Sequence, residues 1–354
     1  MATEIHVEAQ SDHIESLSKA APASAIEELV WNALDADAHE VRVELVTNDL
    51  GAVLAVKVSD DGTGIDMQNA HATFGSLGGS WKRDRSETQA TRRRLHGRHG
   101  CGRFKSFALG SHVEWRTTAM IDGTLRSYCL WGDIERPGVF EFEAAAEPGP
   151  ATGTEVCVTN VRANCDALLN VAETVQTLAS KFALYLKSYP GVRIYFNGLP
   201  VTPVIVQQRA TSYKLTLPQG GEAKLEVIEW KRKFVGAGHL VFAGGDGFQL
   251  HEQSAMVRSG GIPFTAYLVS SRLPVLQAEN ALVMGELNPE VRGYLEEVRK
   301  ILKAHFAAFV KKASPSFISE WKERINSLTN DEKMQLMKLL KKSLKTPLTQ
   351  SPEK

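Results

Sequence analysis

Residues 27–38 read EELVWNALDADA, and this stretch decides how the chain is interpreted. Its apolar residues recur at helical spacing, so it predicts an amphipathic helix. Glu28, Asn32 and Asp35, at positions i, i+4 and i+7, fall on one face of that helix. Polar faces are common on surface helices, so a solvated face is the simpler interpretation. Amide and carboxylate oxygens also suit a magnesium ion, however, and a carboxylate beside such an ion can deprotonate a water molecule.

The start of this helix carries a separate signal. Ser24 is followed three residues later by Glu27, which is the spacing of a capping box. The pattern predicts that the helix begins at Ser24 and that Glu27 has a structural task. The sequence suggests no role for Asp37.

A second motif lies in VSDDGTGI, residues 58–65, where a strand runs into Asp60 and two glycines follow at Gly62 and Gly64. Glycines allow the backbone to approach a ligand closely, and a carboxylate at a strand end can accept a hydrogen bond from an exocyclic amine. An ordinary Asp-Gly turn is the alternative, because this motif alone has little specificity.

A third motif is GRHGCGRFKSFALG, residues 97–110, which predicts a glycine-rich loop that leads into a helix. Free amides at a helix N-terminus suit phosphate groups. The spacing is neither that of a P-loop nor that of a Rossmann fingerprint. The long, polar and basic segment before the loop predicts either a surface loop or a lid over a nucleotide.

Four motifs occur in order along the chain: ExxxNxxDA at 28–36, DxGxG at 60–64, GxxGxG at 97–102, and a late Gly-Thr at 153–154 before a strand. This series resembles the motifs of the GHKL ATPases, which comprise gyrase B, the heat-shock-ninety chaperones, MutL and the histidine kinases, with the MORC proteins alongside. The resemblance covers about residues 20–160, and motifs in series are far more specific than any single one. The first motif is most similar to MutL, whereas FGSLGGSWK with the glycine-rich loop is more similar to MORC and related bacterial ATPases.

The resemblance implies a role for each matching residue. Glu28 matches the general base that polarises the attacking water, Asn32 the magnesium ligand and Asp35 a supporting acid. Asp60 matches the aspartate that reads adenine. The implied ATP-binding residues are Asn32, Asp35, Asp60, Gly62, Gly64, Gly97, His99, Gly100, Cys101, Gly102 and Thr154, with Lys82 and Lys105 added as candidates for phosphate or ribose.

The implied fold class is α/β, in the α+β sense. We expect a Bergerat-type two-layer sandwich, with a mixed sheet and helices on one face, at 1–162, and a lid at about 75–100. A transducer-like α/β domain is expected at 163–312, a helical tail at 313–346 and a disordered end at 347–354. Local patterns agree with this organisation, because Asp122-Gly123 and Asn197-Gly198 each predict a tight turn between two strands.

In GHKL enzymes the second domain commonly carries a basic residue that reaches the γ-phosphate. A gyrase-type pattern would place Gln-x-Lys here, but this chain has Gln277 followed two residues later by Glu279. Arg272 is a candidate substitute for the absent lysine, and Gln277 is the second candidate sensor of the γ-phosphate. The departure from the pattern leaves open whether this domain senses that phosphate.

The bulk composition adds few constraints. The formal net charge of +0 gives no whole-chain attraction to nucleic acid or membrane. Four cysteines without CxxC spacing and a polar start predict the reducing cytoplasm, and no apolar run is long enough to span a bilayer. The basic end predicts either a solvated amphipathic helix or an arm that binds nucleic acid or a partner; its lysines are Lys311, Lys312, Lys333, Lys338, Lys341, Lys342 and Lys345.

Two functions from different classes fit these features. The first is Mg-dependent ATP binding and slow hydrolysis, which drives lid closure and an ATP-dependent homodimer that acts as a clamp. The second is a nucleotide-binding interaction module with negligible turnover in a larger complex. A histidine kinase fits less well, because the ATP helix starts near residue 24 with no room for a preceding phospho-accepting helix. MutL-type repair stays open although the third motif departs from its form, and a DNA or protein partner is not identified.

Overall fold

The computed structural model divides into two compact units, Met1–Pro203 and Val204–Lys354, and each is described by itself. The structure describes residues 19–67, 87–88, 90–93, 95–96, 102–136, 139–216, 222–233, 237–245, 247–320, 329 and 331–335, with the backbone alone for 311–320.

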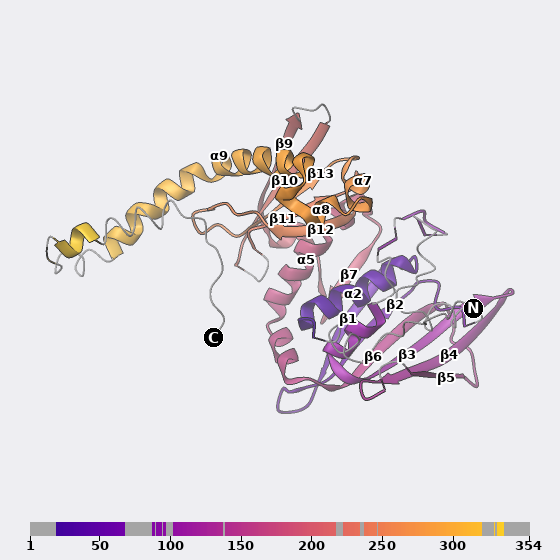
Figure 1. Ribbon diagram of the computed structural model, residues 1–354. Coiled ribbons are helices and arrows are strands. Elements are labelled where there is room, and N and C mark those ends of the chain that lie inside the picture. The colour runs from indigo at the N-terminus through magenta and orange to yellow at the C-terminus, as the bar shows by residue number, and fades with distance from the viewer. Residues whose placement is uncertain are drawn as a thin grey trace, which may run out of the picture. The chain divides into compact units, whose positions relative to one another are not determined.

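The first unit is built on an eight-stranded mixed sheet, as far as the described residues show (Figure 1). Across the sheet the strands are β5 (Phe140–Ala144), β4 (Thr124–Asp133), β3 (Gly110–Ile121), β6 (Gly153–Val161), β2 (Val53–Asp60), β1 (Glu40–Thr47), β7 (Arg193–Phe196) and β8 (Leu199–Pro200). β1 and β7 are parallel, and the other neighbouring strands are antiparallel.

The long β3–β4 hairpin follows from local sequence. Asp122 and Gly123 both have positive φ, 50° and 75°, which is the backbone of a primed two-residue turn. In β3 the buried side chains alternate with more accessible ones, so Val113 and Trp115 face the core whereas Arg116 is exposed. The hairpin predicted at this position is confirmed.

Two helices, α2 (Pro22–Asp35) and α5 (Val171–Ser188), pack together on one face of this sheet. The short helices α4 (Gly102–Lys105), η2 (Ser106–Ala108) and η3 (Ala163–Leu169) contact or precede them. Trp31 of α2 lies against two rings of α5, with centroid distances of 4.8 Å to Phe182 and 5.1 Å to Tyr185. A mixed sheet with helices on one face agrees with the α/β, Bergerat-type fold expected for this part of the chain.

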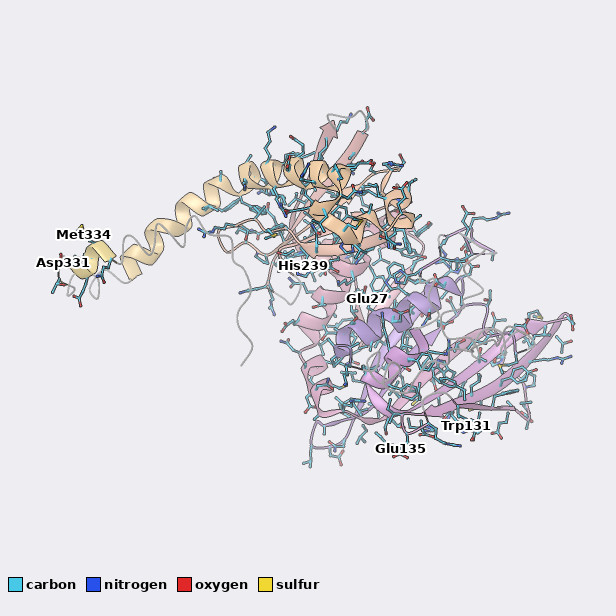
Figure 2. All side chains as sticks on the ribbon, in the orientation of Figure 1. Glu27, Trp131, Glu135, His239, Asp331 and Met334 are labelled. Carbon is cyan, nitrogen blue, oxygen red and sulfur yellow. The ribbon has the colours of Figure 1, made fainter. Side chains whose placement is uncertain are left out.

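The predicted start of α2 at Ser24 is wrong. The helix begins at Pro22 with Ala21 at the N-cap, and no side chain caps it. Proline is favoured at the first helical position because its φ is already helical and its missing N–H would have no partner there. The backbone N–H of Ser24 donates to the Ala21 carbonyl, so Ser24 lies inside the first turn. Figure 2 labels Glu27 on this helix.

The first unit extends beyond the predicted ATP-binding domain at 1–162. Strand β7 pairs with β1 over Glu40–Val43, and α5, β7 and β8 therefore belong to the same compact body. The Asn197-Gly198 turn joins β7 to β8, with φ of 45° and 74°, as its sequence predicts.

The second unit contains a five-stranded mixed sheet among its described residues. The strand order is β12 (Gln249–Ser254), β11 (His239–Ala243), β13 (Phe264–Val269), β10 (Glu222–Trp230) and β9 (Gln207–Thr216). Its helices are α6 (Pro203–Val206), which begins at the boundary between the units, α7 (Leu273–Ala278), α8 (Ala281–Met284), η4 (Gly285–Leu287) and α9 (Pro289–Glu320).

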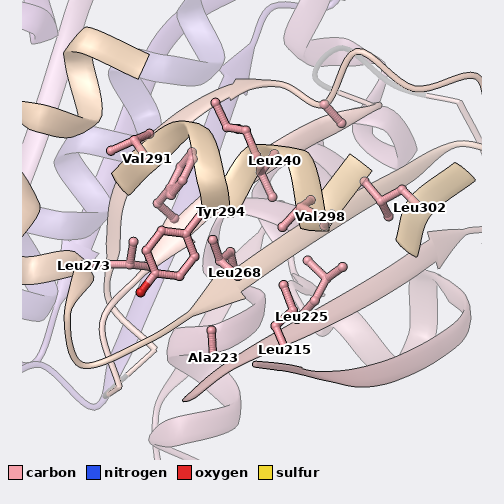
Figure 3. Packing of buried hydrophobic residues seen from close by; sticks show 14 of the residues in the cluster. Leu215, Ala223, Leu225, Leu240, Leu268, Leu273, Val291, Tyr294, Val298 and Leu302 are labelled. Carbon is pink, nitrogen blue, oxygen red and sulfur yellow. The ribbon is translucent and has the colours of Figure 1, made fainter. Parts of the chain in front are cut away.

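The core of the second unit lies between α9 and the sheet. Figure 3 shows Tyr294, Val298 and Leu302 of α9 facing Leu225 and Leu268 of the strands. The α9 residues recur every three to four positions, as an apolar helical face requires.

Helix α9 continues to Glu320 and thus passes through Pro315, beyond the boundary predicted at 312 and 313. The capping box predicted farther on is confirmed: Thr329 N–H donates to Glu332 Oε2 at 2.8 Å, and Glu332 N–H donates to Thr329 Oγ1 at 3.4 Å. Of the helices that the structure describes, none is long and apolar enough to cross a membrane. The end predicted to be disordered, 347–354, lies outside the described residues.

Candidate functional site

On the polar face of α2, Glu28 and Asp35 contact other parts of the first unit. Asp35 is only 6% exposed and accepts a hydrogen bond of 2.7 Å from the backbone N–H of His96. Asn32 is half-buried, and its side chain makes no hydrogen bond to a described residue. The simpler interpretation of a solvated face therefore does not hold for Asp35.

Glu28 lies against the short helix that follows the glycine-rich loop. Its Oε2 is 2.7 Å from the ammonium nitrogen of Lys105. A Cβ added to Gly102 would lie 2.5 Å from Glu28 Oε1, so a larger residue at this position would displace the carboxylate. The first and third motifs, far apart in sequence, meet at this carboxylate.

Asp60 ends β2 and lies opposite Thr154 of β6. Its Oδ1 accepts a hydrogen bond of 2.8 Å from the Gly62 amide, and the Thr154 amide also donates to the carboxylate. Burial raises the pKa of Asp60 to about 6, although both amides act in the opposite direction. A Cβ at Gly62 would lie 2.6 Å from the Ala36 carbonyl, so the second motif also packs against the end of α2.

A buried hydroxyl that no sequence motif indicates connects this region. Thr117 of β3 is 2% exposed; its Oγ1 accepts from the Ile65 amide at 2.8 Å and lies 3.0 Å from Thr154 Oγ1. Gly64, with φ of 75°, packs so closely on this strand that a Cβ would lie 2.1 Å from the Thr118 carbonyl. Thr117 could have been found, because it is a polar residue in the inward-facing series of an otherwise apolar strand.

Asp37, for which the sequence suggested no role, organises part of the predicted lid. It adopts a φ of 64° and accepts hydrogen bonds from the Ala90 amide at 3.0 Å and from the amide and hydroxyl of Thr91. The guanidinium of Arg93 lies 3.7 Å away and donates to the Ala38 carbonyl at 2.8 Å. Burial alone would raise the pKa of Asp37, but hydrogen bonds from Thr88, Thr91 and Ala90 and the Arg93 charge lower it.

The described part of the predicted lid is thus fixed to the C-terminal end of α2. His96 adds a ring contact, because it stacks on Trp31 with a centroid distance of 4.4 Å and an interplanar angle of 8°. The other predicted residues of the lid and loop, Lys82, Gly97, His99, Gly100 and Cys101, lie outside the described residues.

In the second unit, the candidate sensor Arg272 is engaged by a carboxylate. Its guanidinium donates to both oxygens of Glu290, at 2.9 Å and 3.0 Å, and lies 4.0 Å from Glu279. These contacts raise the pKa of Arg272, the hydrogen bond to Glu290 first. The Oε1 of Gln277 is buried without a hydrogen bond from any residue that the structure describes.

The described residues include no ready-made cluster of metal ligands. In the described ranges no three His, Cys, Asp or Glu side chains are grouped so that they could hold one. A magnesium ion carried by phosphates needs only one or two protein oxygens beside phosphate and water, and Asn32, one helical turn from Glu28, could supply one.

Comparison with known proteins agrees with this geometry. Residues 20–132 match the family described as "Histidine kinase-, DNA gyrase B-, and HSP90-like ATPase". This part of the chain is therefore a GHKL-type ATPase domain.

Two curated relatives extend the comparison, and both carry the name "DNA mismatch repair protein MutL". The protein from Halalkalibacterium halodurans is 29% identical over 185 residues, which is 50% of this chain and 26% of the relative. The protein from Bacillus licheniformis is 28% identical over 156 residues, 44% of this chain and 22% of the relative. The chain thus covers about a quarter of the length of these relatives, and its ATPase domain has MutL-like features.

Proposed function

We propose that the first unit binds ATP with Mg²⁺ and hydrolyses it slowly, and that the nucleotide controls the conformation of the protein. The observation that carries this proposal is the convergence of the motifs. Glu28 packs on Gly102, Gly62 packs on the end of α2, and Asp60 pairs with Thr154. These contacts bring residues spread over more than half of the first unit's sequence to α2 and the adjoining strand ends, which supports one connected nucleotide site.

The base of the nucleotide would lie at Asp60. A partly buried carboxylate at a strand end, with two backbone amides already donating to it, can accept one further hydrogen bond from the exocyclic amine of adenine. Thr117 orients the neighbouring Thr154 hydroxyl, because it already accepts from the Ile65 amide and can donate its own proton to Thr154.

The phosphates would lie at the glycine-rich loop and the N-terminus of the segment that starts at Gly102. In the hydrolytic step, Glu28 accepts a proton from the attacking water as the water oxygen bonds to the γ-phosphorus. The bond from that phosphorus to the bridging oxygen then breaks, and ADP and phosphate leave. Magnesium, when bound through Asn32 and the phosphates, neutralises phosphate charge.

The conformational part of the proposal concerns the lid at about 75–100 and an ATP-dependent homodimer. Asp35 and Asp37 tie the described lid residues to α2, next to the proposed phosphate site. Closure of the lid over a bound nucleotide would therefore be transmitted through α2 to the rest of the first unit. The similarity to MutL proteins makes DNA the first partner to include in a binding experiment.

One observation favours the second candidate, a nucleotide-binding module with negligible turnover. Arg272, the candidate sensor, is already paired with Glu290, and glutamate stands at 279 where a gyrase-type pattern has lysine. Single-turnover hydrolysis, measured beside nucleotide affinity, separates the two candidates, because only the enzyme converts bound ATP.

The decisive experiment is Glu28→Gln, with Glu27→Gln on the same helix as the control. Glu28→Gln should bind ATP with nearly unchanged affinity and lose about 100-fold or more of the hydrolysis rate, since general bases contribute that much. The particle size of the Glu28→Gln protein should be larger with ATP and Mg²⁺ than without them, and the comparison is made both with and without DNA. Normal hydrolysis by Glu28→Gln would refute the base assignment, and a monomer under all these conditions would refute the clamp.

A further inference from the structure

The carboxylate of Glu28 is held from two sides by one short helix. Lys105 Nζ lies 2.7 Å from Oε2, and the backbone at Gly102 approaches Oε1 so closely that a Cβ there would lie 2.5 Å from it. The side chain of Glu28 is 13% exposed and that of Lys105 is 33% exposed. Because the pair is partly desolvated and charge-assisted, it is stronger than an exposed ion pair.

The backbone of α4 directs both contacts. Gly102 and Lys105 are three residues apart and thus lie on the same face of this single turn. Buried neighbours anchor the turn, since Phe104 is 2% exposed and both Ser106 and Phe107 are fully buried. The ammonium of Lys105 is therefore aimed at Glu28 by the packing of the chain on either side.

We propose that Lys105 is a positioning residue for ATP hydrolysis, which acts on Glu28 and does not bind the nucleotide. This inference rests on the proposed function of the same site. An ammonium that donates to Oε2 uses one of about four lone-pair positions of a carboxylate, so Glu28 can still accept a proton from water. The ion pair thereby fixes the directions in which the remaining lone pairs of the Glu28 carboxylate point.

The alternative role for Lys105 is a direct contact to phosphate. That contact would remove the counter-charge of a carboxylate that is 13% exposed, and partly buried charges need such a partner. The two roles differ in what removal of the ammonium changes. A positioning residue changes the rate of hydrolysis, whereas a phosphate ligand changes the affinity for ATP.

The test compares Lys105→Met with Lys105→Arg. Lys105→Met should lower kcat about 10- to 100-fold, the loss expected from a small displacement of a catalytic group, while the Kd for ATP stays within about threefold. Lys105→Arg should restore part of the rate, because it keeps a cation beside Glu28. Lys57→Met is the matched control, because the Lys57 side chain is 36% exposed and its ammonium lies 4.0 Å from a different carboxylate, that of Glu155. This variant should leave both kcat and the Kd for ATP unchanged.

The double variant Glu28→Gln/Lys105→Met separates action through Glu28 from independent action. It should hydrolyse ATP no more slowly than Glu28→Gln alone. Lys105 acts only by positioning the Glu28 carboxylate, so its loss has no further effect once that carboxylate is absent. A further loss in the double variant, or a rise of about tenfold or more in the Kd of Lys105→Met with kcat retained, would overturn the inference.

The failure of this inference can be told from failure of the proposed function. A wild-type protein that does not convert bound ATP overturns both. A wild-type protein that hydrolyses ATP, with Glu28→Gln inactive and Lys105→Met as fast as wild type, overturns the role of Lys105 alone.

Discussion

Replacement of Asp60 by asparagine should make the nucleotide-free protein more stable at neutral pH and at the same time weaken ATP binding. The structure gives the reason for the first effect, because burial raises the pKa of Asp60 from 3.8 to about 6. The ionised form of this carboxylate therefore destabilises the folded protein. Asparagine has nearly the same shape and no charge.

The size of the effect follows from the pKa. A tenfold change in an acid dissociation constant corresponds to about 1.4 kcal/mol, so ionised Asp60 costs the folded protein about 3 kcal/mol. Asp60 is only half-buried, and solvent screening reduces this to about 2 kcal/mol. Asparagine loses one of the two amide hydrogen bonds that the carboxylate accepts, which costs about 1 kcal/mol at every pH.

The pH dependence of the stability difference separates the effect of the charge from the effect of the lost hydrogen bond. The unfolded chain releases this proton near 3.8 and the folded protein near 6, so the stability of the wild type declines as pH rises between these values. The variant lacks that decline. The free energy of unfolding of Asp60→Asn minus that of the wild type should therefore rise by about 2 kcal/mol from about pH 4 to about pH 7.5.

Urea denaturation of the nucleotide-free protein at several pH values measures this difference. Asp49→Asn is the control, since Asp49 is exposed in the turn between β1 and β2. Equilibrium titration with ATP at neutral pH should show affinity for the Asp60→Asn variant reduced about 10- to 100-fold, the worth of a hydrogen bond to a charged group. A difference in stability that does not change with pH would refute the reasoning, as would unchanged ATP affinity.

Two further replacements test contacts that only the structure showed. Asp37→Ala should lower the free energy of unfolding by about 3 kcal/mol, because it leaves the buried guanidinium of Arg93 without its carboxylate; urea denaturation measures this, and a loss below about 1 kcal/mol would contradict the anchoring role. Thr117→Val should cost about 1–3 kcal/mol by leaving the Ile65 amide without an acceptor, whereas Thr117→Ser should be close to wild type. Equal stability of the valine and serine variants would show that the hydroxyl is unimportant.

Much of the first unit could be predicted from local sequence. Alternation of apolar residues located β1 and β2, and Asp-Gly and Asn-Gly located the turns, because side-chain direction and positive φ depend on neighbouring residues. The class of the domain was predicted as well, since the order of the motifs carries more information than any one of them. The start of α2 was misjudged, because a capping-box spacing competed with a proline that is better placed at the first helical position.

The sequence by itself therefore determined the class of the domain at 20–132 and the residue types proposed for its nucleotide site. Only the tertiary structure decided what each of these residues contacts: Glu28 with Lys105, Asp35 with His96, and Thr117 with Thr154. These partners are separated by long stretches of chain, and their meeting depends on strand register and on the packing of α4 against α2. Such contacts follow from the whole fold, so no local pattern in the sequence can specify them.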